Sequence, residues 1–400
     1  MNGGKNNIIL LLGLAGFMVM ADNWVVSPIL PIIAANLHIE IPMAGLLITS
    51  YMIPFGIFQV VFGPLADRFG KKEVITCSMI IFSIATGLCA LGTGMRSLAV
   101  FRALTGIFAA SVMPISFALI GDTFPLHQRQ KAIGTFLGIS FLGQGASMAL
   151  GGTIAFLSNW QGVFTTYALL SLIPTTLLIK NYRRLPSVKS TETHFFKTYL
   201  DLLTNPKSLF LYIVIMLEGT FIIGSFSYGG SYLAQTFRFD SLHIGLIMTG
   251  FGIMSVVGGK LSGKLVNIIG SKNVLSLGLS AAAMADIIIW ISGTRLVVFA
   301  LSIALMGLGF IFAHSTLVTR ATEFAQKSRG AAMSLVAFCF MGSGGIGTAI
   351  GGRIIEAHGI KSIFMIYGMG LLSSLLASTL MIRDDNRNPE YIIVSHETTQ

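Results

Sequence analysis

The sequence predicts an all-α membrane protein with twelve transmembrane helices in two pseudo-symmetric six-helix bundles. First, 54% of its 400 residues are hydrophobic and only 10% are charged, whereas ordinary soluble domains carry about 25% charged residues. Second, long apolar runs recur along the chain, and about 20 apolar residues suffice to cross a bilayer. Third, motifs recur at one offset of 200 residues, which indicates that the second half repeats the first.

The apolar runs divide the chain into twelve spans and four regions. We expect the spans at 8–35, 42–66, 73–93, 97–121, 131–157, 161–182, 208–235, 241–266, 273–293, 296–320, 329–354 and 361–382. The first run is too long for a cleavable signal peptide and carries Asp22 in its middle, so it is also expected to span. The regions are an N-terminal bundle, a cytoplasmic linker, a C-terminal bundle and a cytoplasmic tail, at 1–182, 183–207, 208–382 and 383–400.

The repeat is clearest in two glycine-framed stretches. Residues 63–72 read GPLADRFGKK and residues 263–272 read GKLVNIIGSK, so that both glycines and the last lysine keep their places. The same offset relates Arg129 to Arg329. Two six-span halves in parallel orientation predict a substrate site near the membrane midplane, between the halves.

Charge and composition restrict the possible partners. The net charge of +10 is spread over the loops of one side, as the positive-inside rule expects for cytoplasmic termini, and does not indicate a nucleic-acid partner. The cysteines lie inside apolar runs, where small packing residues are common. We find no phosphate-binding loop, metal-spaced Cys/His cluster or nucleophile–base set, and so expect no cofactor, no metal, no use of ATP and no enzyme activity. The three cysteines are Cys77, Cys89 and Cys339.

Residues 63–72 resemble the loop between spans 2 and 3 of the major facilitator superfamily at every defining position of that motif. Residues 101–106 (FRALTG) resemble its span-4 motif, an arginine followed four residues later by a glycine. The resemblance covers nearly the whole chain. It implies the major facilitator fold, alternating access, a small-molecule substrate, a bacterial cell (inner) membrane location and, we expect, a monomer.

Glycines in spans 5 and 11 refine the resemblance. Their spacing in span 5 is similar to that of the twelve-span drug/proton antiporter branch, with Ser147-Met148 standing where the family pattern has Gly-Pro. This departure bears on antiport specifically and not on transport. The glycines concerned are Gly134, Gly143, Gly151, Gly152, Gly347, Gly351 and Gly352.

Three charged residues inside the spans are candidates for proton coupling. Asp22 and Glu218 lie near the middle of spans 1 and 7, where an ionised carboxyl is costly and acids are functional by default. Arg102 of span 4 reaches a depth comparable to Asp22, and the resemblance implies a coupling role for it. We expect Asp22 to carry the proton and Arg102 to tune its release. Glu218 is expected to be a second proton site or the counter-charge of a cationic substrate. The alternatives are packing acids and an arginine that extends to the interface.

Other residues in the spans are assigned to packing or to the cavity. We expect Asp286 in span 9 to be a hydrogen-bonded structural acid. His314 in span 10 could titrate usefully, although a lone histidine in a span is often only hydrogen-bonded. Soft and aromatic side chains suit varied lipophilic ligands, with lipid contact or core packing as the alternative. The cavity candidates are Met20, Asn23, Trp24, Tyr51, Met113, Phe226, Tyr228 and His314.

The charged motif between spans 2 and 3 is expected to form an inner gate that ties the halves together. Asp67 would meet the positive helix end of span 11, and Arg68 would pair with Asp122. Retention of lysines on the cytoplasmic side explains neither the glycines nor Asp67. The gate set is Gly63, Asp67, Arg68, Gly70, Lys71, Lys72 and Asp122.

These observations predict a secondary transporter that exports small amphiphilic or drug-like compounds in exchange for protons. The alternative on the same fold is a proton-coupled importer or exporter of a sugar, nucleoside or other metabolite. A receptor or scaffold would need a sizeable domain outside the membrane, and the loops are too short for one.

Overall fold

The computed structural model describes residues 3–186, 195–324 and 329–381, and these form helices joined by short turns, with no strand among them. Twelve of the described helical stretches are long and apolar enough to cross a membrane, and they fall on the predicted spans. The N-terminal helices are α1 (Gly3–Trp24), α2 (Val26–Asn36), α3 (Ile41–Phe69), α4 (Lys71–Ala90), α5 (Met95–Ala109), α6 (Val112–Thr123), α7 (Leu126–Leu157) and α8 (Trp160–Lys180). The later helices are α9 (Phe195–Thr204), α10 (Pro206–Glu218), α11 (Gly224–Ser227), α12 (Gly229–Phe237), α13 (Ser241–Ile269), α14 (Ser271–Ser292), α15 (Leu296–Phe324), α16 (Arg329–Ala337), α17 (Ser343–His358) and α18 (Ser362–Met381).

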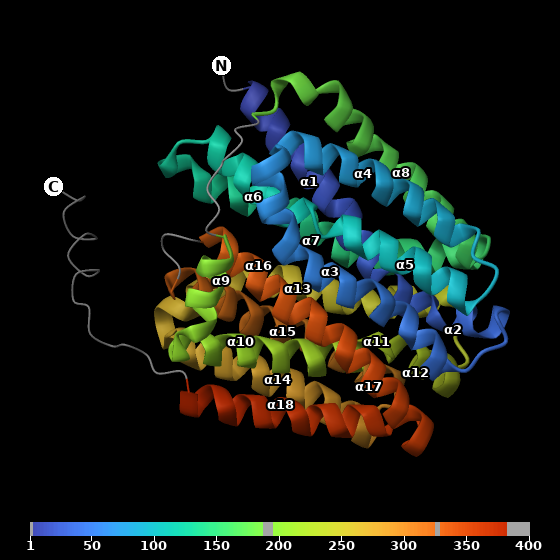
Figure 1. The fold of residues 1–400 in the computed structure, drawn as a ribbon. Coiled ribbons are helices and arrows are strands. Elements are labelled where there is room, and N and C mark those ends of the chain that lie inside the picture. The colour runs from blue at the N-terminus through green and yellow to red at the C-terminus, as the bar shows by residue number, and fades with distance from the viewer. Residues whose placement is uncertain (1–2, 187–194, 325–328, 382–400) are drawn as a thin grey trace.

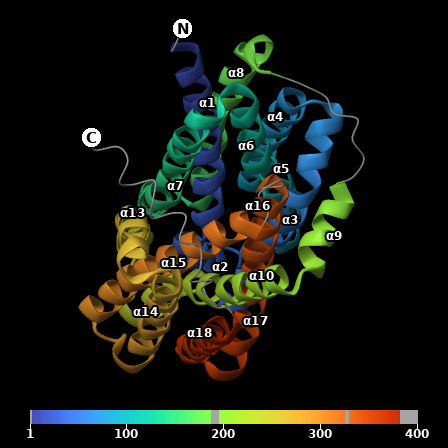
Figure 2. The same cartoon turned by 90° about the vertical axis from the view of Figure 1, so that its left-hand side faces the viewer.

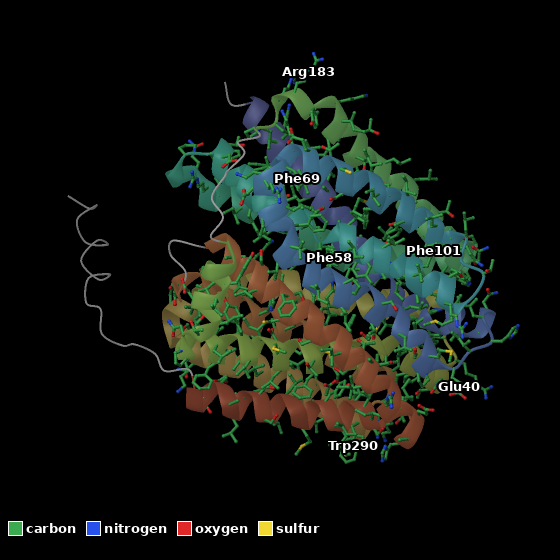
Figure 3. All side chains as sticks on the ribbon, viewed as in Figure 1. Glu40, Phe58, Phe69, Phe101, Arg183 and Trp290 are labelled. Atoms are coloured by element: carbon green, nitrogen blue, oxygen red, sulfur yellow. The ribbon has the colours of Figure 1, made fainter. Side chains whose placement is uncertain are left out.

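The helices form two bundles, which confirms the predicted fold class. Helices α1 and α3–α8 make one bundle and α10–α18 the other (Figures 1 and 2). We call the end at which α1 begins and α18 ends the terminal side; it lies at the left in Figure 1. Glu40 and Trp290 lie toward the opposite side (Figure 3). Parts of the predicted linker and tail, 187–194 and 382–400, lie outside the described residues.

Two predicted spans are each built from two helical segments because of proline. Span 1 breaks at Val25 and span 4 at Ala110-Ser111. Pro28 and Pro114 then stand in the first turns of α2 and α6, where the missing proline N–H is tolerated. Spans 7 and 11 contain π-helical turns at Gly219–Ile223 and Phe338–Gly342.

The duplicated motif has the same backbone in both halves. Gly70 ends α3 with φ 111°, and Gly270 ends α13 with φ 84°. Both angles lie in the left-handed region that favours glycine. Each glycine therefore makes the tight turn into the next helix, α4 or α14, which explains why the sequence repeat keeps it.

Close helix contacts join the two halves on the side opposite the termini. A Cβ at Gly152 of α7 would overlap the carbonyl oxygen of Ser241 at the start of α13, and a Cβ at Gly245 would overlap that of Met148. Nearby, the Ser27 hydroxyl of α2 donates to the carbonyl oxygens of Phe226 (3.2 Å) and Ser227 (3.1 Å). Small residues let the helix backbones approach this closely, so the halves are packed shut at this end.

Candidate functional site

A cavity of about 290 Å³ lies between the two bundles. It is lined by the parts of α3, α6, α7, α15 and α16 that lie toward the terminal side, together with Met20 and Trp24 of α1. Most of the lining is aromatic or aliphatic, including Phe117, Phe141 and Phe310. A largely apolar cavity of this size with a few polar groups has the character of a small-molecule site.

A second cavity of about 270 Å³ continues toward the terminal side. It shares Pro114 and Ser334 with the central cavity, so the two adjoin. Its other lining residues include Asp67 of the duplicated motif and Tyr199 of α9. The second cavity therefore lies between the central cavity and the terminal side.

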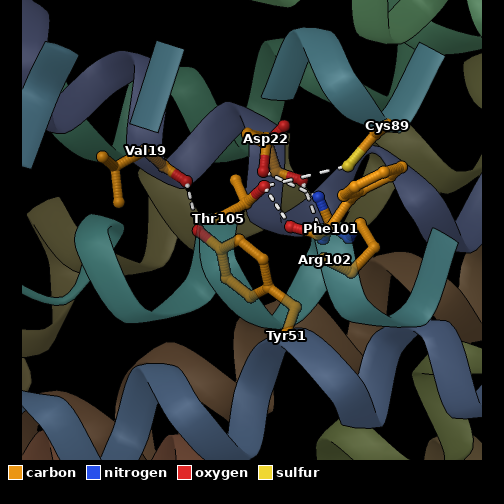
Figure 4. A network of polar contacts seen from close by, with 7 residues as sticks. All are labelled: Val19, Asp22, Tyr51, Cys89, Phe101, Arg102 and Thr105. Atoms are coloured by element: carbon orange, nitrogen blue, oxygen red, sulfur yellow. Dashed lines mark hydrogen bonds and ion pairs between the residues drawn. The ribbon is translucent and has the colours of Figure 1, made fainter. Parts of the chain in front are cut away.

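Asp22 and Arg102 form a fully buried ion pair in the first bundle (Figure 4). Arg102 Nη1 donates to Asp22 Oδ2 at 2.7 Å and Nη2 to the Asp22 carbonyl oxygen at 3.4 Å. The guanidinium carbon lies 4.2 Å from the centroid of the Tyr51 ring, which covers it. Asp22 is 0% exposed and Arg102 is 1% exposed, so the pair is shielded from the central cavity.

The span-4 motif explains how Arg102 reaches this position. A Cβ at Gly106, one turn further along α5, would overlap the Tyr51 carbonyl oxygen of α3. Glycine there lets α5 pack directly on α3. The Tyr51 ring then lies over the guanidinium group, while the tyrosine hydroxyl donates to the Val19 carbonyl oxygen at 3.4 Å. Gly106 therefore allows the close helix packing that places the Tyr51 ring over Arg102.

Glu218 and His314 form the corresponding pair in the second bundle. His314 Nδ1 lies 3.1 Å from Glu218 Oε2. The Glu218 side chain is fully buried and the His314 side chain is 15% exposed. The imidazole stacks against Phe310 and lies tilted against Phe340, with centroids 5.2 and 4.3 Å away. His314 lines the cavity and Glu218 does not, so the histidine separates the carboxyl group from the cavity.

Four of the eight predicted cavity residues line the central cavity and four do not. Met20, Trp24, Met113 and His314 line the central cavity. The lining does not include the other four, and each has another contact. Asn23 Nδ2 lies 3.7 Å from Met341 Sδ, Tyr51 covers Arg102, Phe226 packs on Trp24, and Tyr228 donates to the Thr348 carbonyl oxygen at 2.9 Å.

Two of the predicted gate residues line the second cavity, and one predicted ion pair has a different basic partner. Gly63 and Asp67 line it. The expected Arg68–Asp122 pair is wrong, because Lys71 Nζ donates to Asp122 Oδ2 at 2.6 Å and lies 3.9 Å from Asp67. The turn at Gly70 places Lys71 at the start of α4, whereas the Arg68 guanidinium lies 5.4 Å from the centroid of the Phe69 ring. Lys72 lies over Tyr182, 4.9 Å from the ring centroid.

Most of the predicted glycines stand where helices approach closely. A Cβ at Gly143 would overlap Phe17 and one at Gly347 would overlap Thr220, both at backbone oxygen. Around Gly134, by contrast, there is open space among the described residues. The remaining contacts of the set are those of Gly151 with Val25, Gly152 with Ser241, Gly351 with Ile363 and Tyr228, and Gly352 with Tyr228 and Pro42.

Asp286 differs from Asp22 and Glu218, each of which lies beside a basic side chain. Its side chain is completely buried. Neither carboxyl oxygen forms a hydrogen bond with a residue in the described part of the chain, although the Ser225 hydroxyl lies beside it. The expectation of a fully hydrogen-bonded acid is therefore not met. The described residues also contain no group of three or more His, Cys, Asp or Glu side chains placed to hold a metal.

Two glutamines in the cavity wall are not among the residues predicted from the sequence. Gln59 of α3 and Gln144 of α7 line the cavity, are 2% and 4% exposed, and each leaves Nε2 without a hydrogen-bond partner among the described residues. A long amide in the middle of an apolar span is a signal that could have identified both.

Comparisons with known proteins agree with this architecture. A family model described as Major Facilitator Superfamily matches residues 12–325 and 209–397. The chain is 24% identical to an uncharacterized MFS-type transporter, YceJ, of Bacillus subtilis (strain 168), over 90% of this chain and 94% of that protein. It is 29% identical to the quinolone resistance protein NorA of Staphylococcus aureus, over 60% and 62% of the two chains. A POT family transporter in complex with 5-aminolevulinic acid shares the fold, with TM-score 0.79, 12% identity and coverage of 95% and 97%.

Proposed function

Because the chain belongs to the major facilitator superfamily and is a membrane transporter, not an enzyme, we propose that it couples proton movement to the export of small amphiphilic or drug-like compounds. The observation that carries this proposal is the Glu218–His314 pair, in which His314 lies on the wall of the central cavity and Glu218 lies directly behind it. It puts two groups that can exchange protons beside the place where a substrate would bind.

The coupling follows from how the pair responds to protons. Histidine gains or loses a proton near neutral pH, and an intramembrane carboxyl is stable only when paired, protonated or facing water. One proton held between Glu218 and His314 leaves the pair neutral overall, and its loss leaves a net negative charge in an apolar wall. A substrate seated against His314 would therefore bind with different affinity to the two protonation states. Differential affinity of this kind is what a conformational cycle requires.

Asp22 and Arg102 complete the proposed coupling set. Arginine remains charged in proteins, so it holds Asp22 as its counter-ion until the bundle rearranges. Protonation of Asp22 would release Arg102 and loosen the contact of α1 with α5. We propose that the first pair transmits the proton signal to the bundle, while the second exchanges protons with the substrate cavity.

The proposed orientation places the terminal side in the cytoplasm of a bacterial cell, within the inner membrane. The basic residues of the duplicated motif lie at this side, as the positive-inside rule expects. The structure would then be the inward-facing state, with its cavity reached past Asp67. Closure around Gly63, Asp67 and the start of α16 would form the inner gate in the outward-facing state, and we expect the monomer to be sufficient.

The apolar lining favours an amphiphile over a sugar or nucleoside. The lining side chains with polar groups are one histidine, one tryptophan, two glutamines and small hydroxyl residues. These are too few to replace the many hydrogen bonds that a sugar makes with water. NorA is named for quinolone resistance, which agrees with a lipophilic aromatic compound.

Purified protein in proteoliposomes tests the proposal directly. An imposed pH gradient should drive accumulation of a fluorescent lipophilic compound, with opposite proton movement reported by a pH-sensitive dye. Protein-free liposomes give the background. Transport that does not respond to the gradient, or movement of protons in the same direction as the compound, would contradict proton-coupled export.

A further inference from the structure

We infer that the central cavity selects uncharged aromatic molecules that carry a strong hydrogen-bond acceptor, in preference to lipophilic cations. This inference rests on the proposed function for its physiological meaning and names the substrate class of the same site. It derives from three features of the cavity wall: its charge, its unpartnered amides and its aromatic surfaces.

The wall presents no carboxylate to a ligand. None of the described lining residues is Asp, Glu, Lys or Arg. Two acids of the spans are fully buried against other groups, Asp22 against Arg102 and Glu218 against His314. A cation entering this space would lose its hydration without contacting a counter-ion, which is costly in an apolar site.

Three residues of the wall carry unpartnered hydrogen-bond donors. The Nε2 atoms of Gln59 and Gln144 and the indole Nε1 of Trp24 are buried without hydrogen-bond partners among the described residues. All three residues line the cavity, from α3, α7 and α1. A buried donor without a partner carries a desolvation cost that an incoming acceptor removes. These residues therefore favour a ligand with a carbonyl, phosphoryl or similar oxygen.

Aromatic rings form much of the rest of the surface. Phe310 and Phe340 enclose the His314 ring, and Trp24 stacks with Phe251 behind the wall at 5.7 Å between centroids. Flat rings of this kind pack well against aromatic ligands. They also attract cations through their faces, so the charge preference must be measured with ligands of the same shape.

Three probes of similar shape separate the effect of the ligand's charge from the effect of its hydrogen-bond acceptor. Triphenylphosphine oxide is neutral with a strong acceptor, methyltriphenylphosphonium is its cationic counterpart, and 1,1,1-triphenylethane is neutral without an acceptor. Binding is measured on the full chain in nanodiscs, with empty nanodiscs subtracted, at about pH 6 and about pH 8, on either side of the usual histidine pKa. We expect the oxide to bind about three- to tenfold more tightly than either other probe, the effect of one or two hydrogen bonds.

Glutamine variants connect that preference to the cavity. Gln59→Leu and Gln144→Leu should each weaken oxide binding about threefold or more and leave binding of 1,1,1-triphenylethane unchanged. Gln235→Leu, at an exposed position of α12, is the matched control and should change neither. Since each cavity variant removes an unpartnered buried amide, thermal stability should be equal or higher, which separates loss of binding from misfolding.

Equal binding of the three probes, tighter binding of the phosphonium at either pH, or absence of oxide binding would overturn the inference. Loss of phosphonium binding in Glu218→Gln would instead assign Glu218 as the counter-charge of a cationic substrate. The binding experiment uses no proton gradient, so its result is independent of the transport assay. The cavity can lack the expected selectivity while proton-driven transport is observed, and it can show that selectivity while transport is not coupled to protons.

Discussion

Each half of the molecule contains one buried carboxyl group that is paired with a basic side chain. The two pairs occupy similar places in the two halves, but the basic residue differs. Asp22 is held by an arginine at 2.7 Å and Glu218 by a histidine at 3.1 Å. Arg102 is almost completely buried, whereas the His314 side chain reaches the cavity. Arginine keeps its charge in proteins, but histidine can exist in either form. The first pair is therefore enclosed within its bundle, whereas one member of the second pair contacts the cavity in which a substrate would bind.

The largest expected effect comes from breaking the Asp22–Arg102 pair. Asp22→Asn leaves the Arg102 guanidinium buried without a counter-ion, and removal of one partner of a buried pair costs about 3–5 kcal/mol. We expect a marked fall in the thermal unfolding temperature and loss of proton-driven transport. The double variant Asp22→Leu/Arg102→Met, which removes both charges, should recover most of the stability but not the transport. Wild-type stability of Asp22→Asn would show that the pair is not held as the structure indicates.

Removal of the second carboxyl should affect coupling more than stability. In Glu218→Gln, His314 can become neutral and still hydrogen-bond to the amide, so unfolding free energy should change by about 1 kcal/mol or less. Gradient-driven transport should fall to the level of protein-free liposomes. Exchange of labelled for unlabelled compound without a gradient should persist. If gradient-driven transport continues in this variant, the proton site lies elsewhere.

Replacing the histidine should have a smaller effect, on pH dependence. His314→Gln keeps a hydrogen bond to Glu218 but removes the imidazole, and an amide cannot accept a proton as an imidazole can. We expect transport to be slower yet detectable, with a rate that varies less between about pH 5 and pH 8. The comparison with wild type uses initial rates at matched gradients. An unchanged pH profile would remove His314 from the coupling set.

The smallest effect is expected at Asp286, a buried acid that has no cationic partner among the described residues. A carboxyl in such a place is most stable as the neutral acid, and asparagine closely reproduces its shape. Asp286→Asn should therefore change unfolding free energy by no more than about 0.5–1 kcal/mol and leave transport intact. Loss of transport without loss of stability would place a third acid in the coupling set.

Much of the fold was predictable from the sequence because apolar length and repetition are both local signals. The runs around Asp22 and Glu218 are long enough to cross a bilayer, and the glycines of the duplicated motif require the same left-handed turn at Gly70 and Gly270. The candidate site was predictable only in part. Of the predicted cavity residues, Met20, Trp24, Met113 and His314 line the central cavity, whereas Tyr51 and Tyr228 pack elsewhere. Gln59 and Gln144 line the cavity and were not predicted.

The sequence by itself determined the twelve spans and the rare acids within them, because both follow from the composition of apolar runs along the chain. It also determined the division into two related halves, because the motifs recur at a constant spacing. Only the tertiary structure decided that His314 meets Glu218, that Lys71 and not Arg68 meets Asp122, and that two glutamines face one cavity. The physical reason is that a span is apolar toward lipid and toward its neighbours alike. Its sequence therefore carries little information about which face turns inward, and packing between helices fixes that rotation.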